Sequence, residues 1–120
     1  MNVVLMRGIL SRDPESRALP SGDRLLSFDL TTRTGDEPAD SAPVVWFEPP
    51  EAGASLGAGD DVVVVGRVRR RWFRTGGATQ SRTEVVAERV VLSRHTKRSR
   101  ATLDHALARI AEAFEGGSRP

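Results

Sequence analysis

The chain has 120 residues, enough for one small domain, and it contains no cysteine, which excludes disulfide bonds and thiolate metal sites. The net charge of +2 conceals three unlike parts: −6 over residues 1–66, +9 over residues 67–100 and −1 over residues 101–120. The basic middle part favours a polyanionic partner. The alternative is a dimer in which the acidic part of one chain faces the basic part of another.

Nothing in the sequence indicates a membrane or secretory segment. The apolar start is interrupted by Arg7 and Gly8 and is not followed by a small-residue cleavage pattern, unlike a signal peptide. No stretch approaches the roughly 20 apolar residues that a bilayer span needs. We therefore expect a cytoplasmic protein with no membrane partner.

Apolar and β-branched runs, separated by turn-forming residues, predict five strands before residue 93. The expected strands are Val3–Ser11, Arg24–Arg33, Val44–Glu48, Asp60–Arg74 and Gln80–Leu92. Gly8 indicates a bulge or a sharp bend in the first strand. A polar loop is expected over Thr34–Pro43, and at most a turn or two of helix over Glu51–Leu56. This order predicts an all-β, five-stranded OB-fold, a Greek-key barrel, over residues 1–93, with an SH3-like barrel as the nearest alternative.

After residue 93 the pattern changes from strand to helix. Residues 94–100 are expected to form a basic linker, and residues 101–116 a C-terminal amphipathic helix with Thr102 as its N-cap and Gly116 near its end. The apolar stripe of this helix comprises Leu103, Leu107, Ile110 and Phe114. An isolated helix of this length is marginal in water, so we expect the stripe to dock on the barrel or on another chain.

The fourth strand combines cations with aromatic rings. Four valines lead through Gly66 into a segment whose alternation places four side chains on one face: Arg67, Arg69, Arg71 and Phe73. Val68, Arg70 and Trp72 fall on the other face. Guanidinium groups neutralise phosphates, and a phenyl ring stacks on any base, so the first face predicts sequence-tolerant binding of a single strand. The alternative is a solvated edge strand whose arginines prevent edge pairing.

The other aromatic residues divide between core and surface. Alternation places Trp46 with Val44 on one face of the third strand and Phe47 on the other, and a tryptophan opposite valines favours the core. Phe28, between Leu26 and Leu30, is expected in the core as well. Phe47 and Phe73 are therefore the candidate stacking rings, Trp72 stays open, and Arg82 on the fifth strand extends the basic face.

No set of residues predicts catalysis. His95 and His105 lack a spacing that would let them share a metal, and the glycines form no phosphate-binding motif. We expect a protein that is not an enzyme and has no cofactor, metal or small-molecule substrate.

Several blocks of this chain, in order over residues 2–92, resemble the bacterial single-stranded DNA-binding protein family. The blocks are Gly8-x-Leu10-x-x-Asp13-Pro14-Glu15-x-Arg17, Leu19-Pro20-Ser21-Gly22, Phe28-x-Leu30, Gly66-x-Val68-Arg69-x-Arg71 and a segment from Thr83-Glu84-Val85 to Val90. The resemblance implies an OB-fold, assembly as a dimer or tetramer through the first strands, and single-stranded DNA as partner. It also implies base stacking on the third and fourth strands, at positions that match Phe47 and Phe73.

The chain departs from the family pattern in three places. Aromatic residues are missing from residues 34–43, the helix after the third strand is shortened to residues 49–58, and the family's acidic tail ending in an aspartate-phenylalanine motif is replaced by Gly-Gly-Ser-Arg-Pro. The sequence thus predicts a divergent or accessory single-stranded DNA-binding protein, acting in DNA replication, repair or recombination. Two alternatives stay open: an OB-fold protein-interaction module with weak or no DNA binding, and an RNA-binding OB domain.

Overall fold

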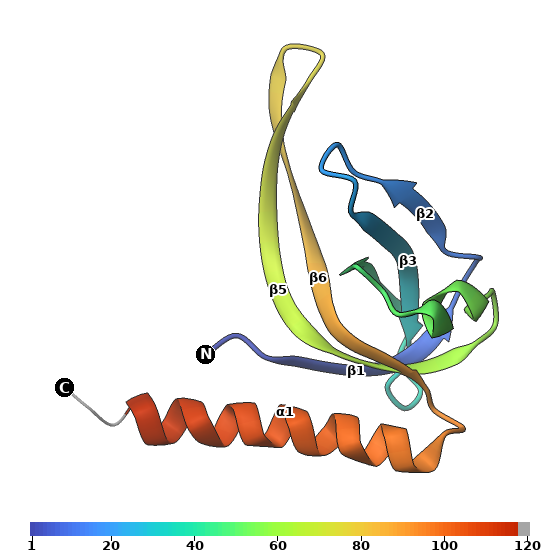
Figure 1. Cartoon of the computed structure of the whole chain (residues 1–120), viewed down its shortest axis with the longest axis vertical. Helices are drawn as coiled ribbons and strands as arrows, with labels where there is room; N and C mark the ends of the chain where they lie inside the picture. The colour runs from blue at the N-terminus through green and yellow to red at the C-terminus, as the bar shows by residue number, and fades with distance from the viewer. Residues whose placement is uncertain (118–120) are drawn as a thin grey trace.

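The structure, a computed structural model, describes residues 1–117 and forms one curved six-stranded sheet with a long C-terminal helix (Figure 1). Its elements are β1 (Val4–Leu10), β2 (Glu15–Ala18), β3 (Arg24–Thr32), β4 (Asp40–Phe47), the 3-10 helix η1 (Glu51–Ser55), β5 (Asp61–Thr75), β6 (Ala78–Leu92) and α1 (Thr96–Gly117). The strand order is β1-β5-β6-β4-β3-β2, and β1 also pairs with β3. That additional pairing closes the sheet into a barrel, which confirms the predicted OB-fold.

Two stretches of strand were not predicted. Glu15–Ala18 forms β2 against β3, although all four of its side chains are exposed. β4 begins at Asp40, inside the expected polar loop, because residues 40–43 continue the ladder with β3. Neither stretch carries the apolar alternation from which strands are recognised in a sequence. Backbone pairing with β3 therefore decides both.

Two glycines, Gly8 and Gly66, allow neighbouring strands to approach more closely than a side chain would permit. A Cβ at Gly8 would lie 2.4 Å from the carbonyl oxygen of Thr31, at the point where β1 exchanges β5 for β3 as its partner. A Cβ at Gly66 would lie 2.1 Å from the carbonyl oxygen of Val86. The register of β5 and β6 shifts between Val65 and Gly66, and Glu88 is the extra residue on β6. For Gly8 we expected a bulge or a sharp bend; the pairing of β1 shows no register shift there, and Gly8 instead permits the close approach of β1 to β3. The bulge lies between β5 and β6.

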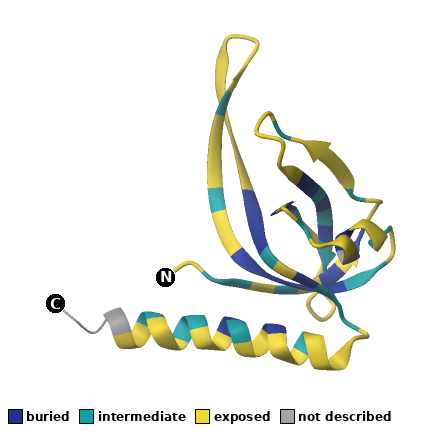
Figure 2. Ribbon diagram, viewed as in Figure 1, coloured by how far each residue is buried: buried dark blue, intermediate teal, exposed yellow. Residues whose placement is uncertain are grey.

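Beyond Gly66, β5 and β6 leave the barrel, and residues 69–84 continue as a two-stranded hairpin arm that projects from it (Figure 1). Its turn is closed by Gly76 and Gly77, whose φ angles of 59° and 81° suit a tight hairpin. The buried residues gather at the base of this arm and inside the barrel (Figure 2). The barrel core is lined by aliphatic side chains from every long strand, together with Phe28 and Trp46.

Helix α1 begins at Thr96, so the expectation of a basic linker over residues 94–100 is wrong. Thr102 is not an N-cap: it is buried in the second turn, where its hydroxyl donates a 2.8 Å hydrogen bond to the carbonyl oxygen of Arg98. Only Ser93, Arg94 and His95 separate α1 from β6. The basic residues consequently project from a helix that is continuous with the domain.

The helix docks through small side chains rather than through the expected stripe. α1 packs against β5, β6 and β1, and its buried residues are Thr102 and Ala106. On β5, Val63 and Val65 alternate with the core residues Val62 and Val64 and are buried as well, so we assign their burial to α1. In the expected stripe Ile110 is half-buried, whereas three residues are exposed: Leu103, Leu107 and Phe114. Small side chains form the contact, in place of the larger apolar ones, because they let the backbone of α1 approach the valines of β5 closely.

An ion-pair cluster pins the helix to the bulge. Glu88 accepts from Arg109 and lies 3.4 Å from Nε2 of His105. Burial acts to raise the pKa of Glu88, but the hydrogen bonds from Arg109 and His105 outweigh it, so the pKa is lowered. This carboxylate therefore stabilises the docked helix at neutral pH, and that stabilisation is lost as the pH falls through the lowered pKa.

No helix of residues 1–117 has the length and hydropathy of a membrane span.

We expect Trp46→Ala to lower the free energy of unfolding by about 3 to 5 kcal/mol, because it removes a large buried ring from the barrel core. Trp72, which is 63% exposed, provides the matched control: Trp72→Ala should change stability by less than about 0.5 kcal/mol. Urea unfolding measures both. Iodide should quench the fluorescence of Trp72 and spare that of Trp46, and a Trp46 that is readily quenched would contradict its place in the core.

We expect Ala106→Arg to displace α1 from β5 and to lower the free energy of unfolding by roughly 1 to 3 kcal/mol, because the site has no room for a longer side chain. Ala108→Arg, on the exposed side of the same helix, adds the same charge as a control and should have little effect. Hydrogen exchange should show faster exchange along α1 in the first variant alone. Equal stability of the two variants would show that α1 does not depend on this contact.

Candidate nucleic-acid interface

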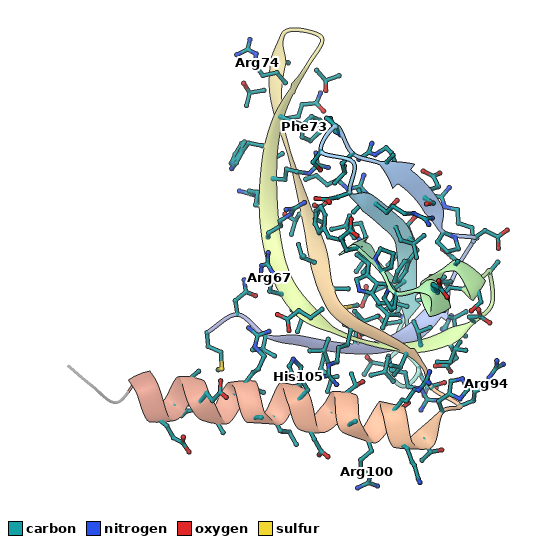
Figure 3. The ribbon with its side chains drawn as sticks, in the orientation of Figure 1. Arg67, Phe73, Arg74, Arg94, Arg100 and His105 are labelled. Atoms are coloured by element: carbon teal, nitrogen blue, oxygen red, sulfur yellow. The ribbon has the colours of Figure 1, made fainter. Side chains whose placement is uncertain are left out.

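A groove of about 500 Å³ lies between the hairpin arm and the outer faces of β2, β3 and β4. Apolar side chains form part of its wall, namely Leu19, Leu25 and Val45. The β2 side contributes Glu15, Ser16 and Arg17, and the arm contributes Arg69, Arg71, Arg82 and Glu84. Figure 3 shows Phe73 on the arm, where it faces the loop between β2 and β3. The groove thus combines an apolar surface with a high density of guanidinium groups.

One buried carboxylate organises the arginines of the groove. Glu84 is 2% exposed, and its Oε2 accepts from Nη2 and Nε of Arg69 at 2.7 and 2.9 Å. Nε of Arg71 lies 3.4 Å from the same oxygen, and Nε of Arg82 lies 3.6 Å from Oε1. Arg71 and Arg82 face each other across the two strands, where two like charges would repel. Glu84 therefore permits three cations to share one face of the arm.

The three arginines differ in how tightly they are held. Arg69 makes two short hydrogen bonds to Glu84, whereas Arg71 and Arg82 approach it only as looser ion pairs. Their side chains are also more exposed, at 43% and 51% against 34% for Arg69. Arg71 and Arg82 can therefore turn to an incoming anion at lower cost than Arg69.

Each of the two candidate stacking rings, Phe47 and Phe73, has an arginine guanidinium group packed over it. Arg69 lies over the ring of Phe47 at 5.2 Å, and Arg71 lies over the ring of Phe73 at 5.2 Å, both measured from the guanidinium carbon to the ring centroid. On the other face of the arm, Arg70 lies over Trp72 at 5.4 Å. Such cation–π contacts orient the rings and the guanidinium planes together. Phe47 still exposes 37% of its surface, which leaves room for a stacked base.

The structure brings four of the six sequence-predicted site residues into the groove. These are Phe47, Arg69, Arg71 and Arg82. Arg67 is exposed but does not line it, because it lies where the arm leaves the barrel (Figure 3). Phe73 does not line it either and lies farther out on the arm, half-buried. Both flank the groove on β5.

Glu84 and the β2 side of the groove were missed as site residues. A signal for Glu84 was present: residues 67–100 contain only two acids among eleven cations, Glu84 and Glu88. Each of the two is the anion of an ion-pair cluster. An isolated acid in a basic segment therefore indicates an internal counter-ion. No such signal exists for Glu15–Arg17, since nothing in their pattern shows what they face.

The two histidines lie in different surroundings. His95 is exposed just before the start of α1, whereas His105 is half-buried and contacts Glu88. Within residues 1–117, no group of three or more histidine or acidic side chains comes together as a metal site would require.

Comparison with known proteins assigns the chain to a family. The model of the single-strand binding protein family matches residues 1–93. The chain is 36% identical over 99 residues to "Single-stranded DNA-binding protein 2" of Listeria innocua, an alignment that covers 75% of this chain and 62% of that protein. It is 31% identical over 100 residues to "Single-stranded DNA-binding protein" of Deinococcus radiodurans, covering 75% of this chain and 33% of that protein.

A protein of the same name from Thermus aquaticus is 31% identical over 127 aligned positions, which cover all of this chain and 42% of that protein. The chain thus spans between one third and five eighths of the length of these relatives. Because the family model covers most of the chain, the chain belongs to the single-strand binding protein family.

Proposed function

We propose that this member of the single-strand binding protein family binds single-stranded DNA in the groove beneath the hairpin arm, without strong sequence preference and without catalysing a reaction. The observation that carries the proposal is the grouping of the exposed Phe47 ring with three guanidinium groups in one groove, those of Arg69, Arg71 and Arg82. A role in DNA replication, repair or recombination follows from binding of this kind.

The groove has an aromatic and apolar surface for the bases and guanidinium groups for the phosphates. A base can stack on Phe47 and pack against the apolar wall around Leu25 and Val45, because every base presents an aromatic face. The phosphates can pair with Arg71 and Arg82, whose ties to Glu84 are loose. Stacking and charge neutralisation do not read base edges, so this mode tolerates any sequence.

Arg69 has a different part in this proposal. Its two hydrogen bonds to Glu84 and its position over Phe47 make it a support for the stacking ring. We therefore assign phosphate contact mainly to Arg71 and Arg82, and ring positioning to Arg69. Arg67 and Phe73 would contact the strand where it enters or leaves the groove.

The arginine cluster also supports the interaction-module alternative. Because Glu84 already provides a carboxylate to all three guanidinium groups, these groups can be explained by structure alone. In that case the groove would hold a protein segment, and DNA affinity would be weak.

Assembly as a dimer or tetramer is part of the proposal. Strand β1 pairs with β5 over residues 4–9 and with β3 only at Ile9 and Leu10, so within the described chain one edge of β1 is open over residues 4–8. Leu5 and Ile9 on this strand are also exposed. An open edge with apolar neighbours suits pairing with a second copy.

Titration of dT and rU oligomers at two salt concentrations tests the function. We expect dT to bind with an affinity that falls steeply with salt, because each neutralised phosphate releases a counterion. Phe47→Ala should weaken binding by roughly 1 to 3 kcal/mol, with Phe73→Ala in the same range, while folding is preserved. Trp72→Ala is the control for loss of a ring on the other face. No dT binding at low salt would sink the proposal in favour of the interaction module, and a clear preference for rU would identify an RNA-binding domain.

Alanine variants of Arg69, Arg71 and Arg82 should differ in how steeply their affinity for DNA falls with salt. Each phosphate contact to a single strand contributes roughly 0.7 to the slope of log affinity against log salt. We expect Arg71→Ala and Arg82→Ala each to reduce the slope by up to about that amount, whereas Arg69→Ala should lower affinity with an unchanged slope. Glu84→Gln should steepen the slope, since it releases the cations from their counter-ion. Equal slopes for all four variants would refute this division of roles.

A further inference from the structure

A second basic surface lies on the other side of β4, between η1, the end of β6 and the first turns of α1. It consists of two adjoining hollows of about 190 and 300 Å³, which share Trp46 and Arg98 in their walls. Arg94 and His95 line the first hollow, and Arg89 lines the second. We call the two hollows together the tail groove. It shares no lining residue with the groove beneath the arm.

The cations around the tail groove have no counter-ion in the part of the chain that the structure describes. Within residues 1–117, no ion pair involves Arg94, Lys97, Arg98 or Arg100. The one carboxylate in the wall, Glu88, is occupied by Arg109 and His105. In the groove beneath the arm, by contrast, Glu84 offsets part of the charge. The tail groove therefore presents its cations to solvent without compensation.

Helix stability does not explain these cations. The first turn of α1 contains no acid, although anions are the residues that stabilise a helix N-terminus. Lys97 and Arg98 at this end carry the same sign of charge as the helix N-terminus and therefore oppose the helix dipole. Cations that make the helix less stable and have no ion-pair partner among the described residues suit an anion from outside the chain.

The surface is held in place rather than carried on a flexible segment. The hydroxyl of Ser99 lies 3.4 and 3.3 Å from the carbonyl oxygens of Leu92 and Ser93 and shares its one hydrogen between them. The amide of His95 donates to the carbonyl oxygen of Leu92 at 3.0 Å. These bonds fix the corner between β6 and α1. Figure 3 shows Arg94 at this corner and Arg100 pointing away from the sheet. Arg94 and Arg98 thus line the groove, while Lys97 and Arg100 do not.

The two grooves are adjacent along the chain. Phe47 lines the groove beneath the arm, and Pro50, three residues later, lines the tail groove. Three residues span at most about 11 Å. Because β4 ends at Phe47, a strand that passes over this ring and round the end of β4 can enter the tail groove on the other side. This continuity favours nucleic acid over an acidic protein segment as the occupant.

We propose that the tail groove binds the phosphate backbone of the same single strand after it leaves the groove beneath the arm, with Arg94 and Arg98 as the main contacts. This inference rests on the proposed function. It extends the nucleic-acid surface from the barrel onto α1 and gives the basic start of that helix a role in binding.

The test compares two double variants that each remove two charges from the same helix start. Arg94→Gln with Arg98→Gln alters the groove, and Lys97→Gln with Arg100→Gln is the control outside it. Both are titrated with dT oligomers from about 5 to about 25 nucleotides, a range that brackets the roughly 4 to 16 nucleotides covered by an OB domain. All four residues are exposed and each variant removes one charge that opposes the helix dipole, so both variants should fold and their thermal melts should match each other.

We expect the groove variant to bind the shortest oligomers normally and to lose several-fold in affinity for longer ones, with a salt slope reduced by roughly 0.7 for each lost contact. The control should lose much less. Equal losses in both variants would overturn the proposal, because they would show a general effect of charge. Unchanged binding at every length would also overturn it, and binding of labelled polyglutamate in its place would assign the surface to an acidic protein segment. Failure of the unmodified protein to bind any oligomer would instead refute the proposed function.

Discussion

The close approach of β5 and β6 at Gly66 is the constraint on which the rest of the structure depends. A side chain at this position would collide with the backbone of β6, 2.1 Å from the carbonyl oxygen of Val86. The contact accompanies the bulge between the two strands, and a bulge bends a strand and increases its twist. Below it β5 is a core strand buried on both sides, and above it the same strand becomes an exposed arm. The bulge also makes Glu88 the extra residue through which α1 is pinned.

The two acids of the basic segment, four residues apart on β6, have similar tasks. Glu84 holds three guanidinium groups on the face of the arm, and Glu88 holds Arg109 and His105 against the barrel. Glu84 is buried and Glu88 half-buried, and a carboxylate removed from water without partners would be costly, so each acid requires the cations that surround it. In return each one places those cations in a defined position. The orientation of the groove arginines is thus part of the fold before any ligand arrives.

The charge on the surface is divided between a compensated and an uncompensated part. In the groove beneath the arm, the carboxylate lowers the net charge and keeps the guanidinium planes next to the rings. Around the start of α1, the cations have no such partner within residues 1–117. The groove beneath the arm is therefore suited to contacts of defined geometry with bases and phosphates. The basic start of α1 is suited to long-range attraction of a polyanion. Helix α1 therefore covers the valines of β5 with one side and carries charge at its beginning.

Short-range patterns in the sequence determined much of this protein. Alternation along β4 separated Trp46 from Phe47, and the strand spacing together with the glycine and proline turns indicated the OB barrel. These features depend on neighbours within a few residues, which a pattern contains. Only the tertiary structure decided the pairing of the exposed β2, the partners of Glu84, and the docking of α1 through Thr102 and Ala106 instead of Leu103 and Leu107. Each of these depends on the space and charge that another segment offers: the valines of β5 admit a helix only at close range, so the size of a side chain outweighed its hydrophobicity.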